Sequence, residues 1–195
     1  FDEEVRMEND AMFFAVDGSV NGAAEGGGVV LGVMMVTGVG GGIVINGQLL
    51  NGLHGIAGGW GHNMLEADGP ECYCGKRGCV ETLLSGPGMA AGFELMFGKR
   101  LSSEEIVQAM QAGDALAQEY MELYLERFGR ALASVVNVID PDCIVLGGGM
   151  SNINLLYREG VEAVRRHVFH DNWQGSIRKH WWGDSSGVRG AAWLW

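Results

Sequence analysis

The stretch Val29–Gly47, VVLGVMMVTGVGGGIVING, decides the fold of this chain. Its first eight residues, Val29–Val36, form a continuous apolar run that is typical of a β-strand buried on both faces. A glycine turn follows, and a second strand is expected at Gly42–Ile45. The Asn46-Gly47 pair favours a type I′ turn, which predicts a β-hairpin into a short third strand at 48–50.

Helical patterns alternate with strands along the rest of the chain. Asn9 or Asp10 can cap a helix over 11–20. Apolar residues recur at helical spacing over 114–138, and Asp140-Pro141-Asp142 ends that helix. The remaining predicted elements are strands at 5–7 and 143–146, an irregular segment at 52–88, a helix starting at the Ser102-x-x-Glu105 capping box and a helix at 155–169. This order predicts an α/β architecture with ligands at the carboxyl ends of the strands.

Composition limits the classes of function. The 195 residues are 47% hydrophobic, enough for a core, and carry a formal net charge of −11. An acidic chain is a poor candidate for nonspecific binding to nucleic acid or to an anionic membrane. Nucleotides remain compatible, because backbone N–H groups and Mg²⁺ can hold phosphates. We expect a cytoplasmic protein with small-molecule ligands, and Phe1 in place of Met predicts a cut amino end.

The sharpest chemical signal is the spacing His62-x9-Cys72-x-Cys74-x4-Cys79. Three cysteines and a histidine suit tetrahedral Zn²⁺, and four ligands would make the zinc structural. The loop at about 58–82 is rich in glycine and has few apolar anchors, so a metal would supply folding energy. The alternatives are a disulfide pair, or three unrelated cysteines beside a surface histidine. Clustering of three of the four cysteines favours zinc.

Five ordered motifs resemble the ROK family, named for repressors, open reading frames and kinases. They are Glu8-Asn9-Asp10-Ala11, TGVGGG at 37–42, GIAGGWGH at 55–62, CYCGKRGCVE at 72–81, and Asp140-Pro141-Asp142 leading to Gly147-Gly148-Gly149. The ending GDSSGVRGAA at 183–192 is most similar to the bacterial fructokinase, or manno(fructo)kinase, branch. The resemblance covers this whole chain and the C-terminal two thirds of such a kinase.

The resemblance implies a fold and an activity. The fold is the α/β, ribonuclease-H-like C-terminal lobe of an actin/hexokinase-type ATPase, with a zinc-binding loop. Residues 1–195 would form this lobe, and the N-terminal phosphate-loop lobe is expected to be absent. The implied reaction transfers the γ-phosphoryl group of Mg-ATP to O6 of a hexose, with fructose as the expected sugar and a homodimer as the assembly. The alternative is a non-catalytic, zinc-stabilised module for sugar sensing or dimerisation.

The resemblance also implies roles for single residues. Asp10 falls on the position of the catalytic base. The expected sugar-binding residues are Asn9, Gly59, His62 and Glu81, and the expected nucleotide-binding residues are Thr37, Gly38, Gly148 and Gly149. The expected zinc ligands are His62, Cys72, Cys74 and Cys79. His62 would place one ring nitrogen on zinc and turn the other toward the sugar.

Three positions depart from the family pattern. Gly59 stands where the family has a Glu that binds two sugar hydroxyls, and its absence should cost roughly 1.5–3 kcal/mol of sugar binding. Met12 stands where Asn is common. Val36 stands where Gly usually precedes Thr37, and a branched residue cannot adopt a positive φ cheaply. We therefore expect the turn after Val36 to be shifted.

Overall fold

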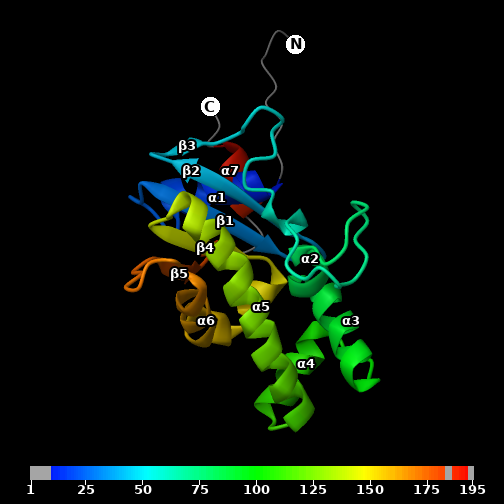
Figure 1. Cartoon of the computed structure of the whole chain (residues 1–195). Helices are drawn as coiled ribbons and strands as arrows, with labels where there is room; N and C mark the ends of the chain where they lie inside the picture. Colours follow the sequence, from blue (N-terminus) through cyan, green and yellow to red (C-terminus); the bar gives the residue numbers. More distant parts are fainter. Residues whose placement is uncertain (1–9, 183–185, 193–195) are drawn as a thin grey trace.

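A five-stranded sheet forms the centre of the protein. The computed structural model describes residues 10–182 and 186–192. The strand order is β3-β2-β1-β4-β5 (Figure 1). The bounds are β1 Val29–Met35, β2 Val39–Ile45, β3 Gln48–Leu49, β4 Cys143–Gly147 and β5 Ser176–Lys179. β1 pairs antiparallel with β2 and parallel with β4, so the apolar run predicted to be buried on both faces lies in the middle of the sheet.

Helices cover both faces of this sheet (Figure 1). α1 (Asp10–Asn21) and α7 (Ser186–Ala192) lie together on one face, and α5 (Ala115–Ile139) and α6 (Glu159–His167) lie on the other. Successive residues of β1 alternate between the two resulting cores. Val30 packs with α1, whereas Leu31 packs with the α5 side.

Two glycines allow α1 to approach the sheet closely. A Cβ added at Gly32 of β1 would lie 2.6 Å from Cα of Ala15, and one added at Gly42 of β2 would lie 2.9 Å from Cα of Met12. Both distances are shorter than real Cβ contacts, so a side chain at either position would push the helix outward. The two glycines therefore set the height at which Asp10, the first residue of α1, stands over the sheet.

Three helices extend away from one end of the sheet (Figure 1). They are α2 (Val80–Leu84), α3 (Gly86–Phe97) and α4 (Ser103–Gln111), and 3-10 turns lie at Trp60–His62, Gly149–Asn152 and Asn154–Tyr157. The predicted capping box of α4 is present. The Glu105 N–H donates to Ser102 Oγ over 3.2 Å, and the Ser102 N–H donates to Glu105 Oε2 over 2.7 Å.

Most predicted elements are confirmed to within a few residues, two predictions were wrong, and some elements were not predicted. The segment 52–88 is not irregular to its end, because α2 and the start of α3 lie in it. The helix predicted at 155–169 is a 3-10 turn followed by α6, since Arg158 leaves the helical region with φ −125° and ψ −76°. β5 and α7 were not predicted. The strand expected at 5–7 lies outside the described residues.

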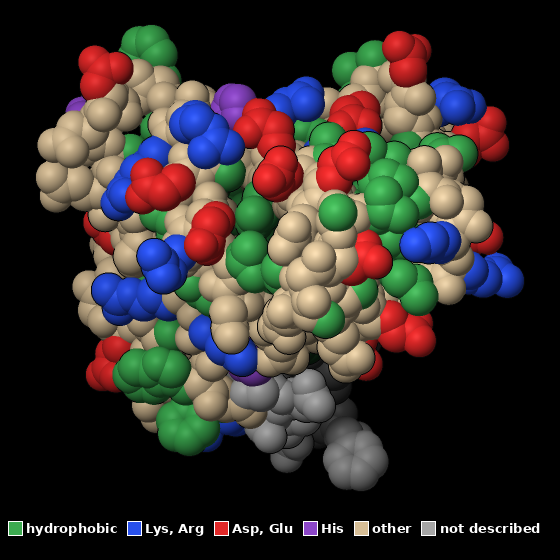
Figure 2. Space-filling view, turned by 90° about the horizontal axis from the view of Figure 1, so that it is seen from below, with side chains coloured by type: hydrophobic (Ala, Val, Ile, Leu, Met, Phe, Trp, Pro, Cys, Tyr) green, Lys and Arg blue, Asp and Glu red, His purple; other side chains and the backbone are tan. Residues whose placement is uncertain are grey.

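The surface carries charges of both signs. Figure 2, which views the molecule from below Figure 1, shows Lys and Arg side chains interspersed with Asp and Glu over this face. Within residues 10–182 and 186–192, every helix is too short or too polar to cross a membrane.

A buried ion pair attaches α7 to α1. Asp17 of α1 is 1% exposed, and Arg189 of α7 donates from Nε to its Oδ1 over 3.0 Å. The guanidinium carbon of Arg189 also lies 4.3 Å from the centroid of the Trp182 ring. Trp182 in turn donates from Nε1 to the carbonyl oxygen of Asn21 over 2.7 Å. Together these contacts hold α7 and Trp182 against α1 on this face of the sheet.

The substitution Arg189→Met should lower the free energy of unfolding by about 2–3 kcal/mol, because Asp17 would stay buried without a cation. The loss is smaller than for a fully buried pair, since Arg189 is 32% exposed. Urea denaturation followed by circular dichroism measures it. The control is Arg165→Met, which breaks an exposed pair with Glu162 and should cost at most about 0.5 kcal/mol. Equal losses in the two variants would contradict the prediction.

Candidate functional site

Two cavities open near the carboxyl end of β1 and share a rim. The first, here called the Asp10 cavity, has a volume of about 640 Å³. The second, here called the Met150 cavity, has a volume of about 520 Å³. Val36 and Thr37, in the turn between β1 and β2, line both. The site thus lies where ligands are expected in an open α/β sheet, beyond the ends of its strands.

The Asp10 cavity brings together residues from distant parts of the sequence. The predicted site residues that line it are Asp10, Thr37, Gly38, Gly59, His62 and Glu81. Its other polar side chains are Asn63, Tyr73 and Lys76, none of which the sequence analysis singled out. Asp10 stands at the amino end of α1, where its Oδ1 accepts a hydrogen bond from the Ala11 N–H over 2.8 Å. The helix dipole at this end favours a carboxylate.

The other predicted ligand-binding residues are placed differently. Gly149 lines the Met150 cavity. Gly148 lines neither cavity; it has φ +80°, and a Cβ there would lie 2.4 Å from the carbonyl oxygen of Met35, so it shapes the turn after β4. Asn9 lies outside the described residues.

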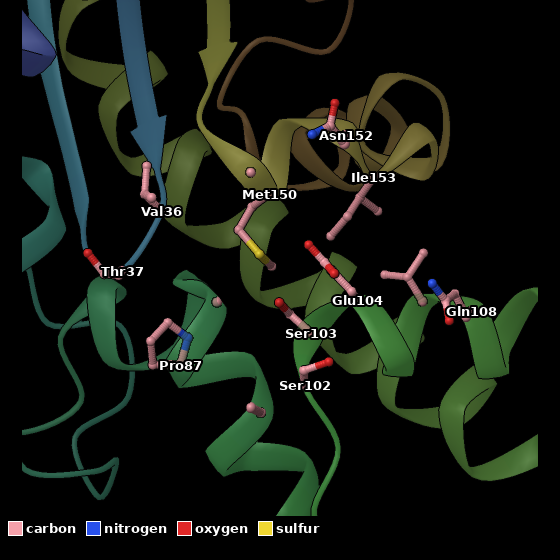
Figure 3. A pocket seen from close by; sticks show the side chains of 14 residues that line it. Val36, Thr37, Pro87, Ser102, Ser103, Glu104, Gln108, Met150, Asn152 and Ile153 are labelled. Atoms are coloured by element: carbon pink, nitrogen blue, oxygen red, sulfur yellow. The ribbon is translucent and has the colours of Figure 1, made fainter. Parts of the chain in front are cut away.

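The Met150 cavity lies between α3, α4 and the turn after β4. In Figure 3, Ser103 and Glu104 from the start of α4 face Met150 and Ile153, and Pro87 of α3 lies on the neighbouring wall. Sequence reasoning named Thr37 and Gly149 of this cavity but missed its walls on α3 and α4. The capping box beside it signalled only a helix start, and the walls come together only through tertiary packing.

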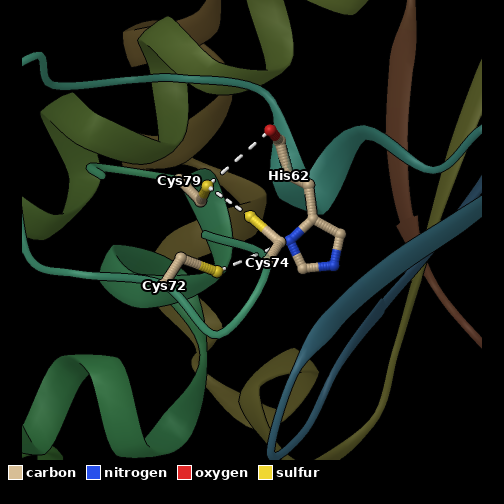
Figure 4. A group of neighbouring side chains, drawn as sticks. All are labelled: His62, Cys72, Cys74 and Cys79. Atoms are coloured by element: carbon tan, nitrogen blue, oxygen red, sulfur yellow. Dashed lines mark hydrogen bonds between the residues drawn. The ribbon is translucent and has the colours of Figure 1, made fainter. Parts of the chain in front are cut away.

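His62, Cys72, Cys74 and Cys79 form one cluster (Figure 4), with their ligand atoms all within 4.8 Å of one another. Cys74 Sγ lies 3.6 Å from Cys79 Sγ, and Cys72 Sγ lies 3.6 Å from His62 Nδ1. A zinc ion with Zn–S bonds of about 2.3 Å separates its ligands by roughly 3.7 Å. The four cysteines are free, and the distance between the Cys74 and Cys79 sulfurs is too long for a disulfide. The donor set and its spacing therefore fit a closed tetrahedral metal site.

The local environment sets the protonation of these thiols. Burial, with the neighbouring Cys74 and Cys72, raises the pKa of the Cys79 thiol to about 12. A hydrogen bond from the backbone of Lys76 lowers the pKa of the Cys74 thiol. A metal entering the cluster must therefore displace a proton from Cys79, so metal uptake should release protons and weaken as the pH falls.

An ion pair and a hydrogen bond attach residues 58–82, here called the cysteine loop, to the rest of the fold. Arg127 of α5 makes two parallel hydrogen bonds to the Glu66 carboxylate, over 2.8 and 2.9 Å. Glu81, in the first turn of α2, accepts a hydrogen bond through Oε2 from the Val39 N–H over 2.9 Å. Glu81 therefore lines the Asp10 cavity and also holds the turn between β1 and β2.

Two ring side chains meet at the wall of the Asp10 cavity. His62 Nε2 and the Tyr73 hydroxyl are 3.0 Å apart, and the two rings lie edge to face with centroids 5.2 Å apart. The nearby carboxylate of Glu81 raises the pKa of the Tyr73 hydroxyl, so this group stays protonated near neutral pH. Nδ1 of His62 points to the cysteine cluster, and Nε2 points to Tyr73.

The three positions that depart from the family pattern are compatible with the local backbone. Val36 does not have a positive φ; its N–H donates to the carbonyl oxygen of Gly38 over 2.9 Å. Met12 is buried at 2% exposure and lines the Asp10 cavity. Gly59 has φ −72°, and the nearest atom to an added Cβ is the carbonyl oxygen of Ile56 at 3.0 Å. Position 59 can therefore accept a side chain after a small shift.

Comparison with known proteins defines the class and then the family. The N-acetyl-D-glucosamine kinase of Histophilus somni is 37% identical over 200 residues, which cover 97% of this chain and 66% of that protein. A ROK hexokinase from Thermus thermophilus matches with a TM-score of 0.87 and 35% identity, over 95% of this chain and 63% of that one. A ROK family glucokinase from Streptomyces griseus, in complex with glucose and AMPPNP, matches with a TM-score of 0.82 and 27% identity, over 95% and 66%.

These similarities place the fold in the actin/hexokinase-like α/β class. The chain spans about two thirds of the length of the curated relatives it matches. The sequence profile of the ROK family matches residues 1–195, and the chain belongs to this family. The resemblance drawn from the five motifs is confirmed.

Removing one predicted metal ligand should abolish metal binding. We expect Cys74→Ser to lose bound zinc and to melt at a lower temperature, because a metal held by this cluster would supply folding energy to the glycine-rich loop. The matched control is Cys143→Ala, which removes the buried cysteine of β4 and should keep the metal. Atomic absorption and thermal melting with and without a chelator test this. A melting temperature unaffected by chelation would exclude a structural metal.

Proposed function

We propose that this chain is the C-terminal lobe, over residues 1–195, of an ATP-dependent hexose kinase of the ROK family. One observation carries the proposal: the six predicted residues named above line one cavity, which shares the Val36–Thr37 rim with a second. A sugar in the Asp10 cavity and ATP in the Met150 cavity would meet at this rim. The names of the relatives support it, since one is an N-acetyl-D-glucosamine kinase and another is a glucokinase in complex with glucose and AMPPNP.

Asp10 is the proposed general base. Its carboxylate accepts the proton of the attacking sugar hydroxyl while the new O–P bond forms and the bond between the β–γ bridging oxygen and the γ-phosphorus of ATP breaks. At the amino end of α1, the hydrogen bond from the Ala11 N–H to Oδ1 orients this carboxylate. Phosphoryl transfer asks for little covalent chemistry from the protein, so the main contribution of the residues is to align the hydroxyl with the phosphorus.

The remaining residues position the two substrates. His62 and Glu81 bind sugar hydroxyls from the cavity wall, and Asn9 is proposed to bind another. The turn at Thr37 and Gly38 presents backbone groups to the phosphates of Mg-ATP, and Gly148 and Gly149 let the nucleotide approach the turn after β4. His62, Cys72, Cys74 and Cys79 would hold Zn²⁺, which supplies no acid, base or redox chemistry here and serves only to fix the loop.

The names of the relatives also bear on the choice of sugar. The relatives' names favour N-acetylglucosamine or glucose over the fructose expected from the ending at 183–192. Homodimer formation stays a prediction. In this proposal the part of the relatives that the chain does not span supplies the phosphate-loop lobe, which would close over the two cavities and exclude water.

We expect Asp10→Asn to lower the rate of sugar-dependent ADP release by about 10²–10⁴-fold while sugar affinity changes little, because the amide cannot accept the proton. The assay uses ATP, Mg²⁺ and each of N-acetylglucosamine, glucose, mannose and fructose, with the chain alone and with a ROK phosphate-loop lobe joined to it. Asp114→Asn, at the cap of α5, is the control and should leave the rate unchanged. Absence of turnover throughout would favour the non-catalytic sensing or dimerisation module.

The substitution Gly59→Glu should strengthen sugar binding by roughly 1.5–3 kcal/mol, because a carboxylate at this wall of the Asp10 cavity would make a charge-assisted bond to a sugar hydroxyl. The matched control is Gly59→Gln, which offers a neutral acceptor of the same size and should gain less. Isothermal calorimetry with N-acetylglucosamine and with glucose measures both. Weaker binding by the Glu variant would show that position 59 does not face the sugar.

A further inference from the structure

Tyr73 occupies a position that the proposed mechanism does not use. Its side chain is 84% exposed, yet it lines the Asp10 cavity. The other three tyrosines of the chain, Tyr120, Tyr124 and Tyr157, are buried or half-buried. The hydroxyl of Tyr73 lies 3.0 Å from His62 Nε2, and both residues line this cavity.

The cysteine cluster determines which partner donates in the hydrogen bond between His62 and Tyr73. Nδ1 of His62 lies 3.6 Å from Cys72 Sγ and belongs to the predicted metal site. A histidine that binds metal through Nδ1 carries its proton on Nε2, so Nε2 is a donor and the Tyr73 oxygen accepts. The single N–H that His62 can offer to the cavity is therefore already used.

We propose that Tyr73 is a gate that a substrate hydroxyl must displace from His62. The inference rests on the proposed function, in which His62 binds the sugar. Cys72 and Cys74 flank Tyr73 and belong to the metal cluster, so the backbone on both sides is held while the exposed ring is able to rotate. Displacement is then a rotation about the side-chain bonds of one residue, without movement of the loop.

Replacing the Tyr73–His62 hydrogen bond by a sugar–His62 hydrogen bond lets the site distinguish sugars by whether they carry a suitable hydroxyl. A sugar that brings an oxygen acceptor to His62 Nε2 replaces the bond that is lost, whereas a sugar without one leaves the His62 donor unpaired or Tyr73 in place. The gate thus lowers affinity for every sugar and lowers it most for sugars that lack the hydroxyl. Tyr73 acts through His62 and is a positioning residue.

The substitution Tyr73→Phe removes the competing hydroxyl and keeps the ring. We expect it to tighten binding of N-acetylglucosamine or glucose by about 2–10-fold in calorimetry, because the sugar no longer displaces a hydrogen bond. The matched control, Tyr120→Phe, removes the same atom from a buried ring that does not line the cavity and should leave sugar affinity unchanged. Equal zinc content shows that the variants keep the loop folded.

Direct evidence for displacement comes from the tyrosine itself. In protein labelled with ¹³Cζ-tyrosine, the Tyr73 signal is identified by its loss in Tyr73→Phe. Saturation with sugar should move this signal toward that of a solvent-exposed tyrosine while the other three stay. Weaker or unchanged binding by Tyr73→Phe, or an unmoved Tyr73 signal at saturation, would overturn the gate alone. Failure of every form to bind any hexose would overturn the proposed function and the gate with it.

Discussion

The hydrogen bond from the Val39 N–H to Glu81 joins two parts of the site that are distant in sequence. Glu81 follows Cys79 by two residues, and Val39 begins β2 directly after the turn that both cavities share. Gly38 makes the fit tight, since a Cβ there would lie 2.5 Å from Glu81 Oε2. A movement of the cysteine loop would therefore also move the turn between β1 and β2. A metal bound to the cysteine cluster would in this way influence the position of the turn at Val36 and Thr37.

The parts of the fold with long apolar patterns were accessible from sequence. β1 and α5 were predicted to within one residue at each end, because seven and 25 residues give enough repeats to separate strand from helix. β5 has four residues, of which only Ile177 is buried, so it leaves almost no pattern. α3 begins with glycine and proline after the Ser85 cap, and this composition resembles a loop until the packing of Phe93 is known.

The candidate site also has parts that local sequence predicts and parts that only the three-dimensional structure shows. The cysteine cluster was predictable because three of its ligands lie within one short loop, where spacing limits geometry. The Asp10 cavity was reached through motif order, since nothing in the residues near Asp10 distinguishes a base from a helix cap. The Met150 cavity and the contact between His62 and Tyr73 needed coordinates. The cavity and the contact both depend on how segments distant in sequence pack together, and a local sequence pattern does not predict this packing.

The pair of Asp17 and Arg189 joins residues 172 positions apart. During synthesis α1 is made long before α7, and Asp17 lacks this cation until Arg189 has been made. The α1 face of the sheet therefore cannot reach full stability before α7 has been added. Contacts of such long range slow folding and leave apolar strands exposed meanwhile.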